Sequence, residues 1–137
     1  MPRLKDRVII DTNLWISFLL TGDYQKLDVI LSERDIDLLF SQTLIDEFID
    51  VANRPKFKKY FSSADLAELL LRVTERALFI EVTSTVDICR DPKDNFLLAL
   101  AKDGKATHLI TGDNDLLSLK SFYKTKIVTL TSYLAKK

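Results

Sequence analysis

Val8-Ile9-Ile10-Asp11 is the stretch from which the fold of this chain follows. Its three β-branched apolar residues predict a short buried strand, because a strand covered on both faces carries an unbroken apolar run. Asp11 comes directly after that run. We therefore expect a carboxylate at the carboxyl end of a buried strand, on the border between the core and solvent.

The pattern of this first strand recurs along the chain. Short apolar runs predict further strands over residues 37–40, 79–82, 108–110 and 126–129. Longer amphipathic segments predict helices over residues 14–20, 24–32, 41–53, 62–78 and 95–103. Short strands that alternate with longer helices indicate an α/β fold, in which helices cover both faces of a parallel sheet. Ligands of such sheets bind beyond the carboxyl ends of the strands, which is where chemistry is expected.

Capping residues mark the ends of several of these helices. Asn13 is expected to cap the first helix, and Ser41 opens the third, which Pro55 ends. Gly104 is expected to close the last helix, because glycine favours the left-handed conformation that follows a helix.

Length and charge limit the classes of protein to consider. The 137 residues suffice for one domain with a hydrophobic core, and no repeat or linker divides them, so we expect a single domain over residues 1–137. Lys and Arg together number 20, as do Asp and Glu, which gives a net charge of zero. This balance argues against a protein held to nucleic acid by bulk charge, since such domains are strongly basic. Contact with a polyanion would have to be local or run through bound metal.

Several kinds of site and location are disfavoured. A single cysteine, Cys89, excludes an internal disulfide, and a single histidine, His108, argues against a Ser/His or Cys/His triad and against a His-rich zinc site. The apolar runs are too short to span a membrane, and the N-terminus lacks the apolar segment of a signal peptide. We expect a cytoplasmic protein without a membrane partner.

Acidic residues gather where the predicted sheet would hold a ligand. Asp11 follows the first strand, and Asp113 comes shortly after the strand over 108–110. Both carboxylates reach the same edge if these strands are parallel and central. Asp94 stands at the start of the buried helix that precedes the second of these strands, a position that favours a carboxylate. Each acid taken alone is more often structural, and only their combination favours a site.

Glu47 joins this set on an angular argument. The apolar residues of its helix form one face, and Glu47 lies just outside that face beside Val51, whereas Asp50 lies near the opposite side. Carboxylates that converge in a crevice repel one another unless they are protonated or bound to a cation. Hard oxygen ligands without His or Cys suit Mg²⁺ or Mn²⁺ better than Zn²⁺. Phosphodiester hydrolysis is the reaction that such a site serves best.

The segments that carry these acids resemble the PIN domain, and more narrowly the VapC-like PIN toxins of toxin–antitoxin systems. The resemblance rests on Val8–Asn13, on Glu47 inside a helix, on Arg90–Asn95 and on Ile110–Leu117, and it covers nearly the whole chain in order. It implies a three-layer α/β/α sandwich with a parallel sheet of about five strands. It also implies cleavage of RNA that depends on Mg²⁺ or Mn²⁺, a cognate antitoxin, and assembly as a homodimer.

The resemblance also implies roles for individual residues. Asp11 and Asp94 would be the principal metal ligands, with Asp113 completing the site directly or through water. Glu47 would position the attacking water or bind a second ion, and Asp115 matches a further acid of the family.

Two polar residues would support those acids. Asn13 follows the first acid and Thr111 precedes Asp113. By the resemblance, both would orient the metal ligands through hydrogen bonds.

Two other stretches are candidates for binding surfaces. A basic segment after the Glu47 helix interleaves aromatic residues with Arg54, Lys56, Lys58 and Lys59. It could grip RNA phosphates and stack a base, or it could be a solvated loop whose aromatic rings pack inward. Leu71 and Leu78 could widen the apolar stripe of the following helix into a contact with a second copy or an antitoxin.

Two alternatives to a ribonuclease remain open. The first is a PIN-like module that binds RNA or a protein partner without cleaving, against which the full set of acids argues. The second is a phosphoryl-transfer or receiver-type α/β protein that uses a strand-end aspartate such as Asp11 as nucleophile. Such proteins need a lysine near the site, and Lys93 and Lys105 are poorly placed for that role.

Overall fold

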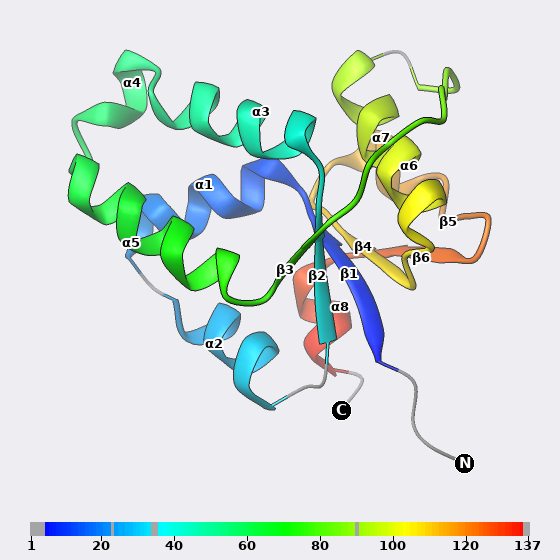
Figure 1. Ribbon diagram of the computed structural model, residues 1–137, viewed down its shortest axis with the longest axis horizontal. Coiled ribbons are helices and arrows are strands. Elements are labelled where there is room, and N and C mark those ends of the chain that lie inside the picture. Colours follow the sequence, from blue (N-terminus) through cyan, green and yellow to red (C-terminus); the bar gives the residue numbers. More distant parts are fainter. Residues whose placement is uncertain (1–4, 23, 34–35, 90, 136–137) are drawn as a thin grey trace.

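The computed structural model describes residues 5–22, 24–33, 36–89 and 91–135, whose core is a six-stranded sheet (Figure 1). The strand order is β3-β2-β1-β4-β6-β5. The strands are β1 (Asp6–Ile10), β2 (Ile36–Phe40), β3 (Ala77–Phe79), β4 (His108–Ile110), β5 (Ser121–Phe122) and β6 (Thr125–Val128). All neighbours pair in parallel except β5, which runs antiparallel to β6 at one edge.

Eight helices surround this sheet in the described residues. They are α1 (Thr12–Thr21), α2 (Gln25–Glu33), α3 (Gln42–Ala52), α4 (Pro55–Lys58), α5 (Ser63–Thr74), α6 (Pro92–Gly104), α7 (Asn114–Leu117) and α8 (Leu130–Ala135). Figure 1 shows α6 on one side of the sheet and α1, α2 and α5 on the other. The predicted parallel sheet between helical layers is confirmed.

β1 is buried, as its sequence predicted, and lies inside the sheet. Val8 and Ile9 are fully buried, and β1 is flanked by β2 and β4, with Ile9 opposite Leu109. The indole of Trp15 is buried below the end of β1, and its Nε1 donates to the carbonyl of Ile10 at 2.9 Å. The apolar run thus forms the middle of the core and fixes where Asp11 leaves it.

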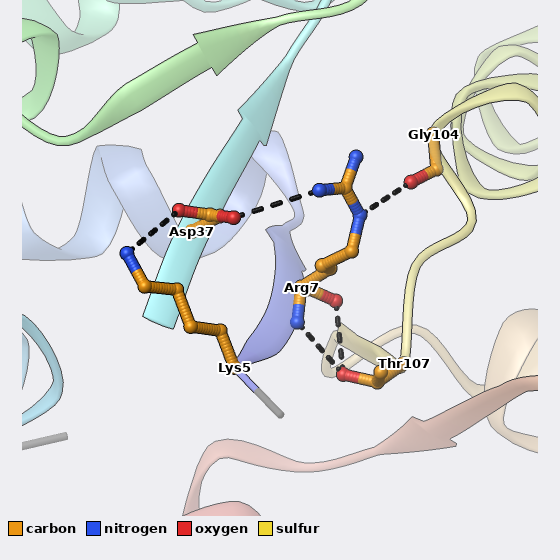
Figure 2. Close-up of polar contacts among 5 residues, drawn as sticks. All are labelled: Lys5, Arg7, Asp37, Gly104 and Thr107. Carbon is orange, nitrogen blue, oxygen red and sulfur yellow. Dashed lines mark hydrogen bonds and ion pairs between the residues drawn. The ribbon is translucent and has the colours of Figure 1, made fainter. Parts of the chain in front are cut away.

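Polar contacts hold the start of β1, at the end of the sheet that lies away from Asp11 (Figure 2). The guanidinium of Arg7 donates to the carbonyl of Gly104 at 2.8 Å and pairs with Asp37 at 3.5 Å. The backbone N–H of Arg7 donates to the hydroxyl of Thr107 at 2.9 Å, and Lys5 lies 3.8 Å from Asp37. These contacts hold the end of α6 and the approach to β4 against β1.

Several element boundaries differ from the expectation. The strand predicted over residues 79–82 lies at Ala77–Phe79, because α5 ends at Thr74 and pairing with β2 then places Phe79 beside Phe40. β5, α4, α7 and α8 were not predicted, since segments of two to six residues carry too little periodic signal.

Two helix starts were also predicted too late. α1 begins at Thr12 with Asp11 in the capping position, so the cap predicted at Asn13 is wrong. α6 begins at Pro92, because proline suits the first turn of a helix and places Asp94 inside that turn. Ser41 does cap α3, accepting a hydrogen bond from the N–H of Leu44 at 3.1 Å.

The end of α6 corrects a third capping prediction. Gly104 is the last helical residue, and the left-handed residue that follows it is Lys105, with φ of 53°. A Cβ on Gly104 would lie 2.8 Å from the buried Cδ1 of Leu39. Glycine is therefore required at this position for close packing against β2 and not for the helix cap.

The helices of the described residues can be compared with the length and hydropathy that a membrane span needs. None of them combines the length and the apolar character that a transmembrane helix requires.

Candidate metal centre

Two acids reach the carboxyl edge of the sheet from neighbouring parallel strands. β1 and β4 pair in register, with Ile10 opposite Ile110, and the N–H of Asp11 donates to the carbonyl of Ile110 at 3.0 Å. Asp113 follows three residues after β4 and caps the short helix α7. Both lie at one edge, as the argument from strand ends predicted.

Thr111 connects these two acids. Its hydroxyl donates to Oδ2 of Asp11 at 2.7 Å and accepts from the N–H of Asp113 at 3.0 Å. Thr111 and Asp11 are both buried, with exposed fractions of 1% and 4%. The hydroxyl therefore fixes the rotamer of one carboxylate and the backbone position of the other, which is the orienting place expected for Thr111.

Asp94, Asp113 and Asp115 form the tightest acidic group among the described residues. One carboxylate oxygen of each lies within 4.8 Å of the others. α6 supplies Asp94 and the start of α7 supplies the other two, where Oδ1 of Asp113 accepts from the N–H of Asp115 at 2.9 Å. Oδ2 of the buried Asp94 has no hydrogen-bond partner in the described part of the chain. A buried carboxylate oxygen without a donor is unstable unless a proton or a cation meets it.

The charges of this group shift its ionisation. Burial, the negative charges of Asp113, Asp91 and Asp11, and a hydrogen bond with Asp113 together raise the pKa of Asp94 to about 7, with burial as the largest cause. Burial also raises the pKa of Asp11, while the hydrogen bond from Thr111 opposes the rise. Carboxylates that repel in this way lose their mutual destabilisation when a divalent cation binds them.

The other predicted acids and polar residues are not members of this group. Asn13 is exposed in the first turn of α1, directly after the capping position of Asp11. Glu47 is half-buried in α3, which packs against α1 and α6, but it is not a member of the group of three acids. Asp11 also stands beside that group and not within it.

Asn95 is a residue that sequence reasoning missed. Its Oδ1 accepts from the N–H groups of Ile88 and Cys89 at 3.2 and 2.8 Å, and its Nδ2 donates to the carbonyl of Cys89 at 2.8 Å. This carboxamide fixes the segment that leads into α6, and so the turn that holds Asp94. Asparagine is a poor helix former, and its place directly after an acid was the available signal.

The basic segment forms α4 and its flanks. Arg54 pairs with Asp50 at 3.6 Å, and the ammonium groups of Lys56 and Lys59 lie over the rings of Phe57 and Tyr60 at 5.0 and 5.3 Å.

The aromatic residues of this segment differ in their exposure. Phe57 and Phe61 pack partly against the core, whereas Tyr60 is 62% exposed. Two rings of this segment therefore pack inward, and one is exposed to solvent; the contact with RNA stays a prediction.

Comparison with known proteins identifies the family. The model of the PIN domain family matches residues 7–115. This chain belongs to the PIN domain family. The match runs from the strand that carries Asp11 to the last of the clustered acids, Asp115. The uncharacterized protein MJ1680 of Methanocaldococcus jannaschii is similar, with 31% identity over 124 residues, which cover 88% of this chain and 79% of the relative.

Solved structures share the fold of this PIN domain. The crystal structure of PAE2754 from Pyrobaculum aerophilum is similar, with a TM-score of 0.62 and 16% identity, covering 96% of this chain and 88% of the other. VapC20 of Mycobacterium tuberculosis, described as a sarcin–ricin loop cleaving toxin, gives a TM-score of 0.58 at 14% identity. That match covers 87% of this chain and 98% of VapC20. At these identities the likeness concerns the fold.

The residues present fit a hard divalent cation. Three carboxylates converge, one of their buried oxygens lacks a donor, and no histidine joins the group among the described residues. Oxygen ligands of this kind select Mg²⁺ or Mn²⁺ over softer metals.

Proposed function

We propose that this PIN domain is an endoribonuclease that hydrolyses RNA phosphodiester bonds with the help of Mg²⁺ or Mn²⁺. The observation that carries the proposal is the convergence of Asp94, Asp113 and Asp115 beside the buried Asp11. A bound divalent ion would supply an activated water and neutralise charge on the reacting phosphate. We extend the proposal to the chain as a single nuclease domain over residues 1–137.

In this proposal each acid has a distinct task. Asp94 and Asp11 hold the cation together with Asp113, and Asp115 adds a fourth carboxylate. Thr111 keeps Asp11 in its ligating rotamer through the 2.7 Å hydrogen bond.

The remaining proposed site residues surround that set. Asn13 orients polar groups at the start of α1. Glu47, half-buried on α3, would position the attacking water or bind a second ion. The basic residues Arg54, Lys56, Lys58 and Lys59 contact the substrate backbone farther away.

The proposed biological role is that of a toxin with a cognate antitoxin. The fold shared with the toxin VapC20 supports it, and the cytoplasm would be the site of action. Assembly as a homodimer is part of the proposal. Leu71 on α5 and Leu78 on β3 are 67% and 39% exposed and offer apolar surface for a second copy.

Cleavage assays test the proposed activity. The purified protein is incubated with total RNA and with a sarcin–ricin loop oligonucleotide, in Mg²⁺, in Mn²⁺ and in EDTA. We expect cleavage with either metal and none in EDTA. Asp11→Asn and Asp94→Asn should remove cleavage while the circular dichroism spectrum stays unchanged. If both variants cleave at the wild-type rate, the site assignment is wrong; RNA binding without cleavage would favour a silent binding module.

A further inference from the structure

A second basic surface lies around the β5–β6 hairpin, where no binding role has been assigned. We call it the hairpin patch, and its exposed members are Lys102, Lys105, Lys120, Tyr123 and Lys124. The ammonium group of Lys102 lies 5.3 Å from the ring centre of Tyr123, which joins the end of α6 to the hairpin. Figure 1 shows this hairpin near α6 and far from α4.

The backbone also brings the other lysines into this patch. The hydroxyl of Thr125 donates to the carbonyl of Ala106 at 2.8 Å, so Lys124 and Lys105, which precede them in the chain, stand at the same end of the sheet. The N–H of Ile127 donates to the carbonyl of Lys120 at 3.0 Å, which places Lys120 at the other end of the hairpin.

Three members of the hairpin patch occupy unfavourable backbone conformations. Lys105, Lys120 and Tyr123 have φ of 53°, 64° and 54°, and they are the only non-glycine residues with positive φ in the described part of the chain. Side chains with a Cβ are disfavoured there, and glycine adopts this region freely. All three positions nevertheless carry long side chains that point to solvent. Strain of this kind collects at functional sites.

The unfavourable backbone conformation is clearest at Lys105. The N–H of Ala106 donates to the carbonyl of Ala101 at 3.0 Å, the pattern of a helix end whose left-handed residue is usually glycine. Lysine stands there instead and is exposed. Stability alone therefore does not explain a lysine at this position.

The charges of the hairpin patch are available to a ligand. None of its lysines forms an ion pair with an acid in the residues that the structure describes. The nearest acid in sequence, Asp103, is occupied by the N–H groups of Thr83 and Ser84 at 2.6 and 2.8 Å. In a chain of zero net charge, four lysines around one exposed tyrosine form a local cationic surface, although Lys102 also helps to lower the pKa of the adjacent Asp103.

Lys120 is the member of the patch that lies nearest in the chain to the acids. Asp113 caps α7 and Asp115 lies in its first turn; the helix ends three residues before Lys120, whose N–H donates to the carbonyl of Leu117 at 3.1 Å. Along α6, Lys102 follows Asp94 by eight residues, a rise of about 12 Å. A few nucleotides of single-stranded RNA can bridge such a distance.

We propose that the hairpin patch binds the single-stranded RNA that enters or leaves the acidic site, with lysines on phosphates and a base stacked on Tyr123. Aromatic stacking combined with cationic contacts is the chemistry by which proteins hold single strands without reading sequence. The proposal rests on the proposed ribonuclease function for its direction, and it concerns binding that is measured without cleavage.

The test measures binding of a fluorescein-labelled 12-nucleotide RNA of mixed sequence by fluorescence anisotropy in EDTA, over a range of salt concentrations. The variant is Lys105→Gly/Lys120→Gly, which removes two charges while relieving the backbone. We expect about tenfold weaker binding, a smaller salt dependence by about 1.4 in the logarithmic slope, and an equal or higher Tm. Lys105→Asn/Lys120→Asn repeats the test with side chains that tolerate positive φ.

The matched control is Lys26→Ala/Arg76→Ala, which changes the net charge equally at exposed positions outside the patch. It should bind RNA within twofold of the wild type. Tyr123→Leu should weaken binding and leave the salt slope unchanged, because it removes stacking but no charge.

Each remaining outcome is decisive. Wild-type affinity in both double variants, equal loss in the control, or no RNA binding by the wild type overturns the hairpin patch. Patch-dependent binding by a protein that never cleaves RNA supports the patch and contradicts the proposed ribonuclease. Cleavage by a protein whose RNA binding does not depend on the patch supports the proposed ribonuclease and contradicts the hairpin patch.

Discussion

The two ends of α6 carry opposite charge, and each lowers the stability of the folded protein for a different reason. At its start, Asp94 is buried beside other carboxylates, and the cost is electrostatic. At its end, Lys105 is exposed in a left-handed conformation, and the cost lies in the backbone. A cation can cancel the first cost, whereas only a change of residue can cancel the second. Both ends thus keep residues that stability alone would not select, which is expected of functional positions.

The largest effect is expected from Asp94→Asn. It should lower the cleavage rate by about 10³-fold or more, because a ligand that stabilises charge in the transition state is worth several kcal/mol. The same change removes a buried repelling charge, so the Tm of the metal-free protein should rise. Saturating Mn²⁺ should raise the Tm of the wild type by several degrees and that of the variant by much less. Scanning calorimetry with and without Mn²⁺ measures both.

The pH dependence of stability separates the electrostatic cost from the conformational one. In the metal-free protein the pKa of Asp94 is raised to about 7 from the ordinary 3.8, so the folded state holds this proton more tightly than the unfolded state. The stabilisation is therefore fully present below about pH 4 and is lost as the pH rises to about 7.

The Tm of the metal-free wild type should accordingly fall across that window relative to Asp94→Asn, in a pH series recorded in EDTA. Parallel curves for the two proteins would contradict the shift. Lys105→Gly should move the whole curve without changing its shape, because no ionisation is involved at that end.

Adjacent positions at the end of α6 sharpen the comparison further. Gly104→Ala should destabilise the protein by about 1–2 kcal/mol, since its Cβ would meet the buried Leu39 at 2.8 Å. Lys105→Gly should leave stability equal or higher. Urea unfolding of both variants measures the difference, and equal destabilisation would show that Lys105 has a structural task.

The smallest effect is expected from the α4 segment. Lys56→Ala/Lys59→Ala should weaken RNA binding by about two- to threefold, less than the hairpin variants. Neither lysine is held in a strained conformation, and Figure 1 shows α4 at the end of α3 that lies away from α6. The anisotropy assay described for the hairpin patch compares the two surfaces directly, and a larger loss for the α4 variant would reverse their ranking.

The sequence determined the frame of this protein. An unbroken apolar run such as Val8-Ile9-Ile10 is typical of a strand covered on both faces, so it predicted a buried strand with Asp11 at its end. The same reasoning placed Asp113 at that edge. The family resemblance then supplied the identity of the set, including Asp115, whose local pattern by itself is that of any exposed helix start.

Tertiary structure decided which of these groups meet and what the meeting costs. The pairing of β1 with β4 brings Thr111 onto Asp11, and α6 brings Asp94 to Asp113, across separations that no local pattern encodes. It also placed glycine and lysine differently from the capping prediction. Gly104 packs against Leu39 inside the helix, so Lys105 is the residue that adopts positive φ. Local propensity depends on each residue and its neighbours in sequence. The distances between carboxylates and the space beside a helix end are defined only in the folded chain.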